Sequence, residues 1–129
     1  MTVSRSQLTP NLVRLRRRSE FVFVRGGKSV RRHSVVVQAR QNRLREADTL
    51  GMGVTATKKI GNAVTRNRAK RRLRAAGKFL LPRCGRANVD YVFIARRDTA
   101  TIGWQRLLDD MESALISLAD QFHADPGSP

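Results

Sequence analysis

The sequence predicts a two-layer α/β (α+β) domain in which helices pack on a small β-sheet. Runs of β-branched and apolar residues over 34–39, 50–57 and 90–95 are typical of buried strands. The segments 62–81 and 104–122 instead place apolar residues three and four positions apart, which indicates amphipathic helices. With 129 residues, 40% of them apolar, the chain is large enough for one domain with one ordinary core.

The first predicted elements are a short helix and a short strand. Ser19 can cap a helix over Glu20–Arg25, whose start could shift toward Leu12. Gly26-Gly27 ends this helix, because adjacent glycines favour a turn. The chain then continues into a short extended segment at 28–30.

The next apolar runs complete the predicted sheet. A polar connection over 40–49 separates the runs 34–39 and 50–57, so we expect these two strands to pair as a hairpin. The run 90–95 supplies a further buried strand. Together with the segment 28–30, these runs make a sheet of three or four strands.

The central segment is predicted to be a helix with one apolar and one cationic side. Asn62 is a good N-cap, because its side-chain oxygen can accept a hydrogen bond from the first turn, and Leu81-Pro82 marks the far end. At about 100° per residue, one narrow face collects the small and apolar residues Ala69, Leu73, Ala76 and Leu80. The roughly opposite face collects Asn67, Lys70, Arg71, Arg74 and Lys78. The apolar side can dock on the sheet while the cationic side stays accessible.

The last predicted helix is amphipathic. Its apolar residues are Trp104, Leu107, Leu108, Met111, Leu115, Leu118 and Phe122. Its acidic cluster, Asp109, Asp110 and Glu112, is expected on the solvated side. The order of elements is therefore αβββαβα, in a domain that we expect to span 12–123, between an extended lead-in at 1–11 and a flexible tail at 124–129.

The balance of charge indicates a polyanionic partner. The chain has 26 Lys and Arg against 10 Asp and Glu, a net charge of +16, and no acidic residue between Thr49 and Val89. Unbalanced positive charge on one element repels itself and favours contact with a polyanion, of which nucleic acid is the first candidate. A membrane surface is the rival, but the sequence has no apolar run of transmembrane length and no lipidation motif. We therefore expect a cytoplasmic protein without a membrane partner.

The residues that usually carry chemistry are scarce. Cys84 is the only cysteine, so an internal disulfide and a multi-cysteine zinc site are excluded, and we expect it to be a buried or half-buried structural residue. His33 and His123 lie far apart without neighbouring ligand-type residues. The basic region has no converging carboxylates to hold Mg²⁺. The sequence thus predicts no catalytic residue and no metal site on the protein.

A longer pattern resembles a known family. The stretch Lys58-Lys59-Ile60-Gly61-Asn62-Ala63-Val64-x-Arg66-Asn67-Arg68-x-Lys70-Arg71-x-x-Arg74 is similar to the Arg-Asn-Arg signature of the bacterial ribonuclease P protein subunit. Glu20-Phe21, 25–30, 51–54 and 92–96 resemble other segments of that family. The resemblance implies a sandwich like the second domain of ribosomal protein S5, with a left-handed βαβ crossover. Composition and periodicity do not indicate that hand.

The resemblance also implies a function. The family's protein assists a catalytic RNA that removes the 5′ leader from precursor tRNA, binds that RNA and the leader, and broadens the range of substrates. The RNA and its Mg²⁺ carry the chemistry, and no protein partner is implied. The implied RNA-binding residues are Lys58, Lys59, Asn62, Arg66, Asn67, Arg68, Lys70, Arg71 and Arg74.

The implied leader site departs from the family's pattern. By resemblance, the leader lies in a cleft near Phe21, Val36 and Gln38, between the first helix and the sheet. The family's strand usually carries aromatic residues there, whereas the run 34–38 has none. Since a base stacked on an aromatic ring gains about 1–3 kcal/mol, leader contacts in this chain are expected to depend more on van der Waals and polar groups.

Two other classes of protein fit part of the sequence. A small basic ribosomal or nucleoid-type nucleic-acid-binding protein would explain the charge, but not the ordered register of the motif. A protein-only nuclease would require metal ligands that the sequence does not offer. A solvated basic helix without a ligand is disfavoured, because no acidic residue lies three or four positions away to form stabilising pairs.

The charge leads to a first prediction, about salt. If RNA binding neutralises about five phosphates, the logarithm of the affinity for single-stranded RNA should fall with the logarithm of salt concentration at a slope of roughly −3 to −4. Titrations of labelled RNA at several salt concentrations measure this slope. An affinity that does not change with salt would contradict the electrostatic interpretation.

Overall fold

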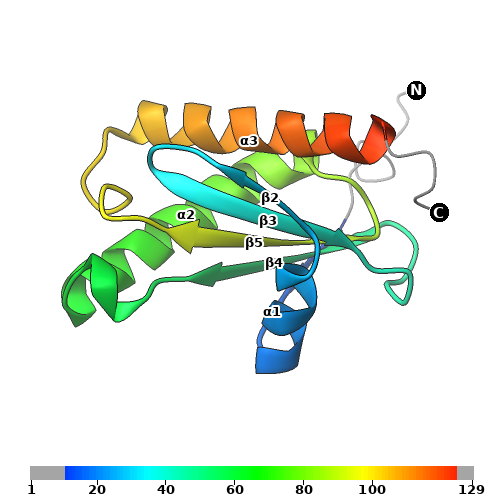
Figure 1. Cartoon of the computed structure of the whole chain (residues 1–129), viewed down its shortest axis with the longest axis horizontal. Helices are drawn as coiled ribbons and strands as arrows, with labels where there is room; N and C mark the ends of the chain where they lie inside the picture. Colours follow the sequence, from blue (N-terminus) through cyan, green and yellow to red (C-terminus); the bar gives the residue numbers. More distant parts are fainter. Residues whose placement is uncertain (1–10, 125–129) are drawn as a thin grey trace, which may run out of the picture.

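The computed structural model describes residues 11–124, which form a five-stranded sheet and three α-helices (Figure 1). The elements are β1 (Asn11–Arg14), α1 (Arg18–Arg25), β2 (Lys28–Arg31), β3 (Val35–Gln41), β4 (Thr49–Thr55), the 3₁₀ turn η2 (Lys58–Ile60), α2 (Ala63–Cys84), β5 (Val89–Ala95) and α3 (Trp104–Ala124). The predicted α/β class and the order αβββαβα are confirmed, with β1 as an additional first strand. The parts of the predicted lead-in and tail at 1–10 and 125–129 lie outside the described residues.

The sheet has the order β1-β4-β5-β3-β2, so the predicted hairpin of β3 and β4 is wrong. β5 lies between them, pairing antiparallel with β3 and parallel with β4. The reason is burial: every residue of β5 except Ile94 is buried, which suits the central position with both faces covered. β4, α2 and β5 thus form the βαβ unit, with two parallel neighbours joined through a helix.

The N-terminal elements also differ from the prediction. β1 pairs parallel with β4, so a paired strand already begins at Asn11, the last residue of the expected extended lead-in. The sequence of β1 lacks the alternation of apolar and polar residues that marks a half-buried strand. In the structure, Leu12 is partly buried and the other three residues of β1 are exposed. α1 starts at Arg18, and its N-cap is Arg17 instead of Ser19. The Glu20 side chain, in the first turn of the helix, satisfies free backbone donors at this end. Its Oε1 accepts hydrogen bonds from the backbone N–H groups of Arg16 and Arg17, both at 2.8 Å.

α2 confirms the predicted cap and the predicted apolar face. Asn62 Oδ1 accepts a hydrogen bond of 2.9 Å from the backbone N–H of Thr65. The residues of the narrow face, Ala69, Leu73, Ala76 and Leu80, are all buried. The predicted end at Leu81-Pro82 is wrong, since the helix includes Pro82 and runs to Cys84. Proline removes one N–H donor, but the Gly85 N–H still bonds to the Leu81 carbonyl at 2.8 Å and extends the last turn.

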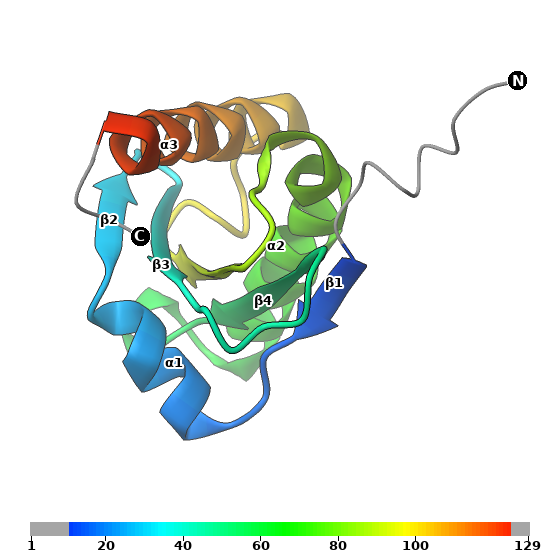
Figure 2. The same cartoon turned by 90° about the vertical axis from the view of Figure 1, so that its right-hand side faces the viewer.

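The sheet separates two apolar clusters. Side chains of β3, β4 and β5, among them Val37, Met52 and Phe93, form the main core with α2 and α3. On the other face, Val92 packs with Leu15 and Val24 beneath α1. Figure 2 shows the sheet between α3 and α1. Leu107, Met111, Leu115 and Leu118 of α3 are buried as predicted, whereas Trp104 is 42% exposed.

A glycine allows α2 to lie close to the sheet. A Cβ atom on Gly77 would be 2.6 Å from Met52 Sδ and 2.9 Å from Phe93 Cε2, nearer than carbon atoms normally pack. The missing side chain therefore lets the helix axis approach β4 and β5. The close packing sets the distance between α2, with its cationic face, and the sheet.

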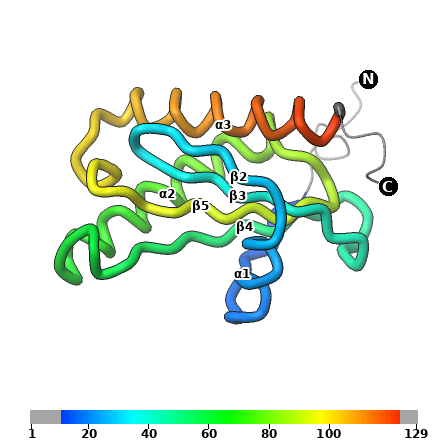
Figure 3. The backbone as a smooth tube through the Cα atoms, in the orientation of Figure 1, coloured from blue at the N-terminus to red at the C-terminus, as the bar shows by residue number. Residues whose placement is uncertain are grey.

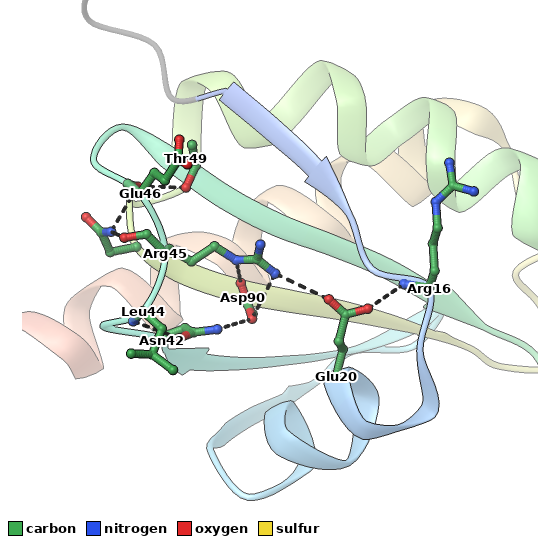
Figure 4. Close-up of polar contacts among 9 residues, drawn as sticks. Arg16, Glu20, Asn42, Leu44, Arg45, Glu46, Thr49 and Asp90 are labelled. Carbon is green, nitrogen blue, oxygen red and sulfur yellow. Dashed lines mark hydrogen bonds and ion pairs between the residues drawn. The ribbon is translucent and has the colours of Figure 1, made fainter.

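A polar network joins α1, the connection 42–48 and β5 (Figure 4). The buried carboxylate of Asp90 accepts a hydrogen bond of 2.7 Å from Arg45 Nε and one of 3.0 Å from Asn42 Nδ2. Arg45 also lies 3.7 Å from the carboxylate of Glu20. The hydrogen bond to Asp90 raises the pKa of Arg45, and the backbone N–H groups of Arg17 and Arg16 lower the pKa of Glu20. The network positions α1 beside the sheet.

Loss of Arg45 should destabilise the fold. Arg45→Ala leaves the buried Asp90 carboxylate with Asn42 as its remaining side-chain donor, and breaking a buried ion pair costs about 3–5 kcal/mol. We expect a drop at the low end of that range, because Arg45 itself is partly exposed. Urea unfolding measures the change, with exposed Arg43→Ala as the matched control. Equal unfolding midpoints for the two variants would show that the network does not stabilise the fold.

Candidate nucleic-acid interface

The nine residues implied to bind RNA lie along two consecutive elements, from the 3₁₀ turn η2 to the middle of α2. We call them the α2 surface: Lys58, Lys59, Asn62, Arg66, Asn67, Arg68, Lys70, Arg71 and Arg74. Six are exposed, and Arg66, Lys70 and Arg74 are half-buried. None of them forms an ion pair within residues 11–124, where the ion pairs involve Arg45 and His33. The structure therefore brings these cations together without an acidic partner.

Like charges lie close together on this surface. Burial, followed by the nearby charge of Arg14, lowers the pKa of Arg74. Burial and the charge of Arg68 lower the pKa of Arg72 in the same way. Burial is the larger cause of both shifts, and the smaller cause, a neighbouring arginine, shows that like charges lie close together here.

Two arginines of α2 bind backbone carbonyls instead of presenting all their donors to solvent. Arg68 Nε donates to the carbonyl of Ala100 at 2.7 Å. Arg72 donates from Nη1 to Thr99 at 2.7 Å and from Nη2 to Ile102 at 2.5 Å. Figure 3 follows the connection between β5 and α3, which these bonds attach to α2. Arg72 lies outside the motif, and its position four residues after Arg68 was the signal that could have identified it.

Arg66 has a different environment. Its Nε is buried and has no hydrogen-bond partner among the described residues. A buried donor without a partner is unfavourable, so the side chain gains if a ligand oxygen approaches it. Asn67 is exposed beside it and can offer both amide donors and an acceptor.

Phe21 links α1 with the α2 surface. It borders a hollow of about 280 Å³ that is also lined by Arg14 and Arg74, and a second of about 360 Å³ that is also lined by Arg18 and Lys70. We call these two hollows the Phe21 groove. An aromatic ring thus lies between cations from β1, α1 and α2.

Val36 and Gln38 lie on the same side of the sheet but do not line the Phe21 groove. They pair with Ile94 and Val92 of β5, whose side chains belong to the α1 side. Both are half-buried. The structure therefore brings Phe21 to the α2 surface and leaves Val36 and Gln38 further along the sheet face.

The acidic cluster of α3 is only partly solvated. Asp110 Oδ2 accepts hydrogen bonds from the hydroxyl and the backbone N–H of buried Ser34, at 2.8 and 3.2 Å. The expectation that all three acids face solvent is therefore wrong for Asp110, which attaches α3 to the turn between β2 and β3. Within residues 11–124, no group of three or more His, Cys, Asp or Glu side chains is arranged to hold a metal ion. No helix in that range is long and apolar enough to cross a membrane.

Comparisons with known proteins agree on one family. The family model described as Ribonuclease P matches residues 9–119. The "Ribonuclease P protein component" of Caulobacter vibrioides is 53% identical over 106 residues, which cover 82% of this chain and 70% of the relative. That of Ruegeria pomeroyi is 47% identical over 105 residues, covering 81% and 84%. The solved structure of a mutant Staphylococcus aureus RNase P protein is 28% identical, with a TM-score of 0.68 and coverage of 83% and 87%.

The carbonyl contacts of Arg72 lead to a stability prediction. Arg72→Gln loses two hydrogen bonds from a charged donor, each typically worth about 1.5–3 kcal/mol. We expect the free energy of unfolding to fall by at least the value of one such bond, about 1.5 kcal/mol. Amide hydrogen exchange in the connection 96–103 should also become faster. The neighbouring exposed Arg71→Gln should change stability by no more than about 0.5 kcal/mol. If the two variants unfold alike, Arg72 does not hold this connection.

Proposed function

The chain belongs to the ribonuclease P protein family, and we propose that its α2 surface contacts the catalytic RNA while its Phe21 groove receives the precursor tRNA leader. The protein is a subunit of an endoribonuclease holoenzyme that processes the 5′ end of tRNA, and its partner is the RNA subunit. The single observation that carries the assignment of the site is the row of cations on η2 and α2 that has no carboxylate partner among the described residues. A general basic ribosomal or nucleoid-type role is not favoured, because the family match covers most of the chain.

The chemistry of the α2 surface suits a folded RNA. Arginine can bind two phosphate oxygens with its planar fork or stack on a base, whereas lysine acts as a compact charge. Asn67 can bond to a base edge or to a ribose hydroxyl. Because Arg66 is half-buried and Arg68 Nε is bound to Ala100, the exposed residues Lys58, Lys59, Asn67 and Arg71 offer the most accessible donors.

The Phe21 groove suits a single strand that continues from this surface. One ring can stack on one base, a contact worth about 1–3 kcal/mol. Arg14, Arg18, Lys70 and Arg74 line the two hollows and can bind the phosphates on either side of that base. Val36 and Gln38 would supply van der Waals and polar contacts further along the leader. This division follows the absence of aromatic residues from β3.

The protein contributes binding and positioning rather than chemistry in this proposal. Mg²⁺ would be held by the RNA subunit, which would carry the hydrolysis of the phosphodiester bond. Binding the leader would supply affinity that does not depend on the sequence of the tRNA body, and so broaden the range of substrates. The complex would act in the cytoplasm.

Reconstitution tests the proposal. Precursor tRNA is incubated with the protein alone, with the RNA subunit alone at low Mg²⁺, and with both together. We expect accurate cleavage at the leader junction chiefly in the complete mixture. Cleavage by the protein alone, after all RNA has been removed, would contradict the assigned division of roles.

A paired variant tests the α2 surface itself. Lys70→Gln with Arg71→Gln should weaken binding to the RNA subunit and make the salt slope less steep by about two, one for each phosphate that is no longer neutralised. These positions are preferable to Arg68, whose bond to Ala100 would combine a binding effect with a structural one. Arg31→Gln with Arg106→Gln removes the same charge from exposed positions outside the site and serves as the control. Identical slopes for both double variants would argue against RNA binding by this face of α2.

A further inference from the structure

A second cationic hollow lies apart from the α2 surface and the Phe21 groove. It measures about 480 Å³ and is lined by Gly26, Gly27, Lys28, Ala39, Arg40, Gln41, Arg43 and Phe122. Arg86 extends it, because its guanidinium lies 5.8 Å from the centre of the Phe122 ring. Within the part of the chain that the structure describes, no acidic residue lines the hollow. We call Lys28, Arg40, Arg43, Arg86 and Phe122 the Phe122 pocket.

The Phe122 pocket is remote from the motif. Arg86 follows the C-terminal end of α2, whereas Lys58 and Lys59 precede its N-terminal end. A helix of 22 residues spans about 33 Å, so Arg86 lies roughly that far along the axis from Lys58 and Lys59, and about 15 Å or more from Arg74, the last residue of the α2 surface. Figure 1 shows the C-terminal end of α3, which carries Phe122, at the opposite end of the molecule from the first turn of α2. The pocket cannot therefore be an edge of the α2 surface.

Aromatic rings lie against three of the four cations of the pocket, Lys28, Arg40 and Arg86. The Arg40 guanidinium stacks 4.3 Å from the centre of the Phe23 ring, and its Nη1 donates to the Phe23 carbonyl at 3.0 Å. Lys28 Nζ lies 5.6 Å from the centre of the Phe122 ring. A ring orients a cation without neutralising its charge. The rings thus fix the direction of these positive charges in advance, which lowers the entropy lost when an anion binds.

Glycine keeps the floor of the pocket open. A Cβ atom on Gly26 would lie 2.9 Å from Arg40 Nη1, and one on Gly27 would lie 2.6 Å from Arg40 Cβ. A side chain at either position would displace Arg40 from its place over Phe23. The two glycines that end α1 therefore also shape this second site.

We propose that the Phe122 pocket binds backbone phosphates of a second segment of the catalytic RNA, so that the protein bridges two parts of that RNA. The proposal rests on the proposed function, since it assumes that the RNA subunit is the ligand. Mostly exposed cations gathered around a ring fit a phosphodiester chain. A membrane surface would instead call for an amphipathic helix with an exposed apolar face, whereas the apolar face of α3 is buried in the core.

The test compares three double variants of the full-length protein in binding the RNA subunit. Arg43→Gln with Arg86→Gln removes two charges of the pocket. Lys70→Gln with Arg71→Gln removes two from the α2 surface, and Arg31→Gln with Arg106→Gln is the matched control. We expect the pocket variant to bind more weakly than the control and its salt slope to be less steep by about two. Circular dichroism confirms that each variant is folded.

The outcomes separate this proposal from the assigned function. If the pocket variant equals the control while the α2 variant loses affinity, the bridging proposal is overturned and the proposed function stands. If only the pocket variant loses affinity, the pocket is supported and the assignment of the α2 surface fails. Sedimentation with phosphatidylcholine–phosphatidylserine vesicles tests the alternative ligand. If the pocket variant alone loses binding to these vesicles while its RNA binding is unchanged, the ligand of the pocket is a lipid surface and the proposal is overturned.

Discussion

The packing of α2 on the sheet is the contact on which the arrangement of the molecule depends. No carboxylate of the described residues pairs with the cationic side of the helix, so apolar contact holds it together with the carbonyl bonds of Arg68 and Arg72. Ala69, Leu73 and Ala76 supply a narrow buried face, and Gly77 lets this face approach Met52 and Phe93. Small residues therefore do two things: they bring the helix close and leave the long cationic side chains to point outward.

Several carboxylates bind parts of the protein to one another instead of pairing with α2. Asp90 binds Arg45, Glu20 fixes the first turn of α1, and Asp110 binds Ser34. Each of these contacts lies away from the outer face of α2. The placement of the carboxylates, and not only their small number, is thus what keeps the potential of that face positive.

Elements that a local pattern determines could be predicted from the sequence, whereas those that depend on a distant segment could not. The cap at Asn62 and the buried face of α2 follow from the spacing of neighbouring residues. The pairing of β3 with β4 was wrong, because β5, far along the chain, takes the central place between them. Strand β1 exposes three of its four residues and shows no periodic pattern. The Phe122 pocket could likewise not be predicted, since it joins residues from β2, β3, the connection 42–48, the connection after α2 and α3.

The same limit applies to the arginines. Arg68, Arg71, Arg72 and Arg74 follow one another on a single helix. The spacing places Arg68 and Arg72 one turn apart, but it does not reveal that the fold itself supplies their partners. Contact with the connection before α3 makes the difference, because it gives carbonyl partners to Arg68 and Arg72 and, among the described residues, none to Arg71. Arg45 is similarly occupied by Asp90. Arginines that bind the fold have fewer donors left for RNA, so we expect the number of phosphates bound to be smaller than the 26 Lys and Arg of the chain.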